Sequence, residues 1–184
     1  MAARRIIEYG YPILRKKAKP VGRITQQVRT LIDEMAETLC EAGGLGLAAP
    51  QVGESLQVLV ADVGDGLITM VNPQIVRREG EQVGLEGCLS LPGLHGDVRR
   101  AAKVTVKGRN SAGKPVSIAA EDLFARVLQH EVDHLNGILF IDRVEPDTLH
   151  WAIEDPEAEG EMRLEYVTVE QATRLFETRV SAKL

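Results

Sequence analysis

The sequence predicts an α+β fold with an antiparallel sheet. Two segments, 25–42 and 120–137, have the apolar spacing of amphipathic helices, and short segments rich in β-branched residues lie between them. These helices and strands do not alternate regularly, as a doubly wound parallel sheet would require. With 184 residues, of which 44% are hydrophobic, the chain is long enough to form one domain with a substantial core.

The first predicted helix covers residues 25–42. Thr25 is suited to the N-cap, and Gly43 and Gly44 end the helix. Cys40 lies near its end, and we expect it to pack as a small buried residue. The apolar residues at helical spacing are Val28, Leu31, Ile32, Met35 and Leu39.

Strands are expected after the Gly-rich segment 43–53. Residues 56–62 and 67–73 form a predicted hairpin, because both are rich in apolar and β-branched residues and a turn-like segment separates them. Further strands are predicted at 74–78, 101–107 and 115–120, with a turn at 110–113.

The second predicted helix ends at Asn136–Gly137. Beyond it, Thr168 and Gln171 have the spacing of a capping box, which predicts a short helix near the C-terminus. No repeat or flexible linker divides the sequence. We therefore expect one domain, with its main part at 1–150 and an acidic extension of the same domain at 151–184.

Composition excludes several classes of protein. The net charge of −5 argues against a DNA-binding protein, and two cysteines are too few for a disulfide framework. We find no signal peptide and no apolar run long enough for a membrane span, so we expect a cytoplasmic protein, with a bacterial origin favoured over an organellar one. Residues 154–165 carry six acidic side chains and one basic one. The simplest interpretation of this acidic segment is a loop exposed to solvent.

The segment HEVDH at 130–134 is the clearest chemical signal. Residues four apart lie on one face of a helix, so His130 and His134 can bind one metal ion. Glu131 is then placed to act as a general base towards a water on that ion. We interpret Asp133 as support for the helix or as a partner of a ligand.

A catalytic metal site of this kind needs a third protein ligand. Cys88, flanked by Gly87 in a glycine- and proline-containing segment, is the first candidate. His95, His150 and a carboxylate of the acidic extension are alternatives.

Three segments in this order, GLGLAAPQ at 44–51, EGCLS at 86–90 and QHEVDHLNG at 129–137, resemble the motifs of the peptide deformylase family. The resemblance extends from about Ile6 to Val144. It implies antiparallel β-sheets packed around a central helix that carries the HExxH motif. It also implies that Cys88, His130 and His134 are the metal ligands.

The same resemblance implies catalytic roles. Glu131 would transfer a proton from water to the departing amine. The Gln51 side-chain amide and the Leu89 backbone N–H would donate to the oxyanion. The substrate would be the formylmethionine of nascent polypeptides, bound by strand addition along Gly44, Leu45 and Gly46, with its methionine side chain beside Leu45 and Val127.

The family association implies one divalent metal ion, with Fe²⁺ favoured and Zn²⁺, Ni²⁺ or Co²⁺ able to replace it. Two alternatives remain open at this point: a zinc endopeptidase that uses the same HExxH chemistry, and a non-catalytic relative that binds formyl peptides.

The chain departs from the family pattern at two places. His95 stands where many members carry an arginine that helps to hold the peptide. The extension is acidic, whereas some deformylases end in a basic helix that is thought to contact the ribosome. If transient ribosome contact occurs here, the basic segment 15–19 is the better candidate.

Overall fold

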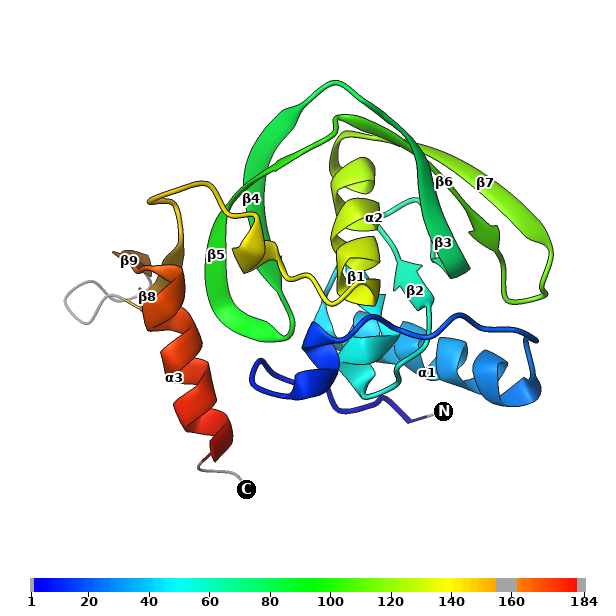
Figure 1. Ribbon diagram of the computed structural model, residues 1–184, viewed down its shortest axis with the longest axis horizontal. Coiled ribbons are helices and arrows are strands. Elements are labelled where there is room, and N and C mark those ends of the chain that lie inside the picture. Colours follow the sequence, from blue (N-terminus) through cyan, green and yellow to red (C-terminus); the bar gives the residue numbers. More distant parts are fainter. Residues whose placement is uncertain (1, 155–161, 182–184) are drawn as a thin grey trace.

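In the described part of the chain, two antiparallel sheets and three α-helices make up the fold (Figure 1). The structure is a computed structural model, and it describes residues 2–154 and 162–181. A five-stranded sheet has the order β1 (Gly46–Ala48), β2 (Val58–Ala61), β3 (Ile68–Glu79), β6 (Lys103–Arg109) and β7 (Pro115–Glu121). A four-stranded sheet has the order β4 (Gln82–Cys88), β5 (Leu91–Arg100), β8 (His150–Glu154) and β9 (Met162–Tyr166). The predicted α+β class is confirmed.

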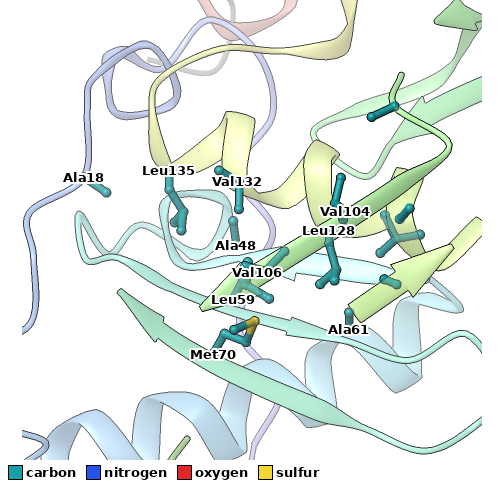
Figure 2. Packing of buried hydrophobic residues seen from close by; sticks show 14 residues of the cluster. Ala18, Ala48, Leu59, Ala61, Met70, Val104, Val106, Leu128, Val132 and Leu135 are labelled. Atoms are coloured by element: carbon teal, nitrogen blue, oxygen red, sulfur yellow. The ribbon is translucent and has the colours of Figure 1, made fainter. Parts of the chain in front are cut away.

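Helix α2 (Asp122–Leu135), which carries the HEVDH segment, lies between the two sheets (Figure 1). One side packs on the five-stranded sheet, where Leu128, Val132 and Leu135 meet Leu59 and other buried residues (Figure 2). The other side directs the histidines towards β4. Packing on both sides buries almost the whole helix, so its polar residues need partners inside the protein.

Helix α1 (Gln26–Ala42) has the predicted ends. The Thr25 side chain accepts a hydrogen bond from the Val28 backbone N–H, and Gly43 ends the helix with a left-handed φ of 62°. The prediction that Cys40 is buried is wrong, because its side chain is exposed. The buried stripe runs through Met35 and Leu39, and Cys40 lies about 100° further round the helix than Leu39.

The predicted strands at 67–73 and 74–78 are one strand, β3. The chain continues from one predicted segment into the next through a bulge between Val71 and Gln74. There Asn72 adopts φ 52°, and its side chain exchanges two hydrogen bonds with the Val21 backbone. Strands β1, β4, β5, β8 and β9 were not predicted. In β4 and β5, Gly84, Gly87 and other glycines hide the apolar alternation.

The C-terminal extension adds two strands to the smaller sheet. β8 pairs with β5 and with β9, and α3 (Val169–Ser181) follows. The predicted capping box is present, because the Thr168 and Gln171 side chains each accept a hydrogen bond from the other's backbone N–H. Most of the acidic segment 154–165 lies outside the described residues. The division of the chain at residue 150 stays a prediction.

Across the described residues, none of the helices has the length and apolar character that crossing a membrane requires.

Candidate metal centre and active-site cavity

Three potential metal ligands meet where the end of β4 faces α2. Cys88 Sγ lies 3.2 Å from His134 Nε2, which in turn lies 3.2 Å from His130 Nε2. Each of the three residues offers one ligand atom, and these atoms lie within 4.8 Å of one another. A thiolate and two imidazoles at such distances fit a divalent transition metal.

The other proposed third ligands lie elsewhere. His95 sits on β5 with its ring stacked on that of His150 at 6.1 Å, and neither belongs to this group. In the acidic segment, Glu165 does not belong to this group either, and the carboxylates at 155–161 lie outside the described residues. Within the described ranges, Cys88 is the residue that completes the histidine pair.

His130 is held by a carboxylate that sequence reasoning did not single out. Glu86 Oε2 lies 2.9 Å from His130 Nδ1, which leaves Nε2 for the metal. Burial alone would raise the pKa of Glu86, but hydrogen bonds from Arg100 and His130 outweigh burial and lower the pKa to about 2. Glu86 is therefore ionised and fixes the ring orientation. The sequence signal that could have identified Glu86 is its position as the first residue of the EGCLS motif.

Two buried arginines balance this carboxylate. Arg100 donates from Nε and Nη2 to the two Glu86 oxygens, at 2.9 Å each, and Arg126 Nη1 donates to Oε1 at 2.8 Å. Arg100 also pairs with Asp133, which accepts two further hydrogen bonds from Arg143. Asp133 thus links α2 to this network through two arginines, and it lies outside the group of potential metal ligands.

The pKa values of the two histidines are shifted in opposite directions. Burial lowers the pKa of His130, but hydrogen bonds with Cys88 and Glu86 outweigh burial and raise it well above its ordinary value. Burial, together with the neighbouring His130, lowers the pKa of His134 well below its ordinary value. His134 is therefore neutral near pH 7, which is the form that binds a metal.

Glu131 points into the same site from the next position on α2. Its side chain is buried, and its Oε2 makes no hydrogen bond to any described residue. Burial raises the pKa of Glu131 to about 7. A carboxyl group with a pKa in this range is suited to exchanging protons at neutral pH.

Gly46 makes room for that carboxylate. A Cβ added to Gly46 would clash with Oε1 of Glu131, so any side chain there would push the carboxylate away. Strand β1 therefore approaches α2 closely only because residue 46 is glycine.

Gln51 lies next to Cys88 of the ligand group. It belongs to a short 3-10 helix, Ala49–Val52, and its Oε1 accepts a hydrogen bond from the Ala48 backbone N–H at 2.8 Å. This bond orients the amide nitrogen towards Cys88 Sγ at 3.6 Å and Ser90 Oγ at 3.4 Å. The amide N–H groups therefore face the ligand group.

A cavity of about 530 Å³ opens beside these residues. It lies between two sheet edges, because β1 is the edge strand of the larger sheet and β4 that of the smaller one. Each of the predicted substrate-binding residues lines it, namely Gly44, Leu45, Gly46 and Val127, and so do Gln51, Cys88, Leu89, His130 and Glu131.

A family model described as polypeptide deformylase matches residues 3–149. The chain belongs to this family. It is 56% identical over 146 residues to a peptide deformylase of Halothermothrix orenii, which covers 78% of this chain and 95% of that protein. A peptide deformylase of Carboxydothermus hydrogenoformans is 50% identical over 145 residues, covering 79% of this chain and 95% of that protein.

Solved structures of deformylases share the fold. The peptide deformylase of Thermotoga maritima is 43% identical, with a TM-score of 0.78, and the match covers 79% of this chain and all of that one (100%). The enzyme of Thermus thermophilus is 37% identical, with a TM-score of 0.72, and covers 96% of this chain and 92% of that one. The second match includes most of the C-terminal extension.

Family membership establishes the activity. The protein is an enzyme, a hydrolase of protein biosynthesis that removes N-terminal formyl groups. The family is metal-dependent, in agreement with the Cys88, His130 and His134 group. Deformylation is therefore favoured over the endopeptidase and the non-catalytic alternatives.

Proposed function

We propose that Cys88, His130 and His134 hold one divalent metal ion, and that Glu131, Gln51 and the Leu89 backbone N–H carry out deformylation around it. The observation that supports this proposal is the convergence of three metal-binding atoms beside a buried carboxylate, one oxygen of which has no partner among the described residues. When bound, such an ion lowers the pKa of a coordinated water and polarises a carbonyl.

The protein's own residues supply the remaining steps. Glu131 takes the proton of the attacking water and delivers it to the departing amine. Gln51 Nε2 and the Leu89 N–H donate hydrogen bonds to the oxyanion that forms on the formyl carbon. The backbone N–H of Ala48 already fixes the Gln51 side chain. The amide N–H groups of Gln51 therefore need no reorganisation as charge develops on the oxyanion.

The substrate is the N-formylmethionyl end of a nascent chain, bound in extended form. Gly44 to Gly46 leads into the edge strand β1, so a peptide can add to this sheet by backbone hydrogen bonds. Leu45 and Val127 line the same cavity and offer apolar contact to the methionine side chain.

We propose Fe²⁺ as the native metal, with Zn²⁺, Ni²⁺ or Co²⁺ able to replace it. Metal analysis of protein purified without oxygen should find about one iron per chain. Formate release from formyl-Met-Ala-Ser should then decay faster in air for the iron form than for the nickel form, because ferrous iron and its thiolate ligand oxidise. Zinc in the anaerobic protein, or equal half-lives of the two forms, would contradict the assignment.

We further propose that the enzyme acts in the cytoplasm with transient ribosome contact through segment 15–19. Lys16, Lys17 and Lys19 are exposed there, whereas Arg15 pairs with Asp142 at 2.5 Å. Cosedimentation with ribosomes at low salt should be lost when these lysines are replaced by glutamine. Unchanged cosedimentation would exclude this segment as the contact.

A further inference from the structure

The four-stranded sheet has an outer face that begins at the active-site cavity, with exposed apolar side chains on its edge strands β4 and β9 and the buried His150 between them. Register pairs place Gly87, His95, His150 and Tyr166 in one row across β4, β5, β8 and β9. Paired residues share a face of an antiparallel sheet. The ring contacts agree, with centroids 6.1 Å apart for His95 and His150 and 5.5 Å apart for His150 and Tyr166.

Large apolar side chains are exposed on this same face. Val83 and Leu85 alternate with Gly84 on β4, and Met162 and Leu164 precede Tyr166 on β9. Their exposed fractions are 50%, 58%, 57% and 48%, and that of Tyr166 is 62%. We use the name sheet belt for the side chains of Val83, Leu85, His95, His150, Met162, Leu164 and Tyr166.

The opposite face of the sheet is covered. Leu94 and Trp151 point there and pack in a buried cluster with Phe176 of α3. Single exposed apolar residues are ordinary in soluble proteins, but several on one face of one sheet indicate a binding surface.

The sheet belt is continuous with the cavity. Leu85, Gly87 and His95 line the cavity and also belong to the face that carries the belt. Gly87 keeps the passage open, because a Cβ there would lie 2.8 Å from the His95 ring. A peptide leaving the cavity past Gly87 therefore emerges onto the sheet belt.

We propose that the sheet belt binds the downstream part of the nascent chain, in extended form and through apolar side chains, while the formylmethionine occupies the cavity. This proposal rests on the proposed arrangement of the active site. Three strand spacings of about 4.8 Å separate β4 from β9, a distance that about four extended residues span. Substrates must therefore continue for about four residues beyond the cavity to reach Tyr166.

The test compares formyl-Met-Ala-Ser with two ten-residue formyl peptides, one with leucine and phenylalanine in its second half and one with serine there. The variant is the double substitution Leu164→Ser with Tyr166→Ser. The control is Val76→Ser, which alters a residue on β3 of the other sheet that is 52% exposed. All of these side chains are exposed, so folding should tolerate the changes.

A leucine or phenylalanine of the peptide that covers about 50 Å² of apolar surface on the sheet belt should tighten binding about fivefold to tenfold. The double variant should lose about that factor in kcat/KM for the apolar ten-residue peptide, while its values for the tripeptide and the serine peptide stay unchanged. Val76→Ser should leave all three values unchanged.

Equal kcat/KM values of the wild type and the double variant on the apolar peptide would overturn the proposal. A wild-type dimer in sedimentation equilibrium that the double variant dissociates would also overturn it, since the belt would then bind a second copy. Absence of formate release from the tripeptide by the wild type would instead contradict the proposed active site.

Discussion

At the scale of single residues, the site depends on one carboxylate in an unusual setting. Glu131 is buried, its pKa is raised to about 7, and its Oε2 has no partner among the described residues. Burial of such a group costs free energy, and a structural role would normally provide a hydrogen-bond partner. The arrangement is instead that of a group kept available for a substrate or a water.

Replacement of Glu131 by glutamine tests this role. Glutamine keeps the size of the side chain but cannot accept a proton, so kcat for formyl-Met-Ala-Ser should fall by roughly 10²- to 10⁴-fold. Metal content should stay at the wild-type level, because Glu131 is not in the ligand group. If the variant loses its metal, the residue contributes to metal binding and the assigned role is wrong.

A substitution at Gly46, which lies against the Glu131 carboxylate, provides a second test of the role of Glu131. In Gly46→Ala the new methyl group meets Glu131, and a displacement of about 1 Å in a catalytic group costs about 10²-fold in rate. Gly22→Ala is the control, because a Cβ there meets nothing within 4 Å. Formate release by both variants checks the prediction, and wild-type activity of Gly46→Ala would show that β1 moves aside without cost.

At the scale of elements, charged residues join α2 to β4 and β5. Glu86 and Arg100 come from the hairpin, and Asp133 and Arg126 come from the helix. The side chains of Glu86 and Arg100 are only 3% and 4% exposed. Charges this deeply buried are stable only while their partners remain.

Arg100→Met should therefore destabilise the metal-free protein by about 3 kcal/mol, since Glu86 and Asp133 each lose a buried partner. It should also weaken metal binding by about tenfold, because Glu86 orients His130. Urea unfolding and metal loss to a chelator measure the two effects. Arg99→Met is the matched control: its side chain is 52% exposed, and it should cost less than about 1 kcal/mol. An equally small effect of both substitutions would count against the network.

The sequence predicted this site only in part. The alignment of His130 with His134 follows from helix geometry alone, whereas the choice of Cys88 over the other ligands came from the family resemblance. The contacts of Arg100 and Arg126 with Glu86 were not predictable, because they join residues 14 and 40 positions apart through tertiary packing. The glycines of β4 and β5 hide the apolar alternation of these strands in the sequence. Because some of these glycines also line the cavity, the strands that form the site were the harder ones to predict.

At the scale of the whole molecule, helix α3 packs on the rest of the chain through a buried cluster. Phe176 is fully buried, and its ring lies 5.4 Å from that of Trp151 and 6.1 Å from that of Tyr9. The family model matches residues 3–149, so α3 lies outside the part of the chain that the model covers. The catalytic part should therefore work without a docked α3.

Phe176→Ala tests whether the catalytic part works without a docked α3, and it does so without truncating the chain. Loss of a buried phenylalanine costs about 3–5 kcal/mol, and a helix of 13 residues is marginal without packing. We expect proteases to cleave α3 rapidly in this variant, while the metal content and the formate release from formyl-Met-Ala-Ser stay at wild-type levels. Leu175→Ala, next to it on the exposed side of α3, should show neither change, because its side chain is already 44% exposed. If Phe176→Ala instead lowers tripeptide activity in proportion to the loss of α3, the extension supports the active site directly, and the cluster around Leu91 and Leu94 must transmit that support to Cys88.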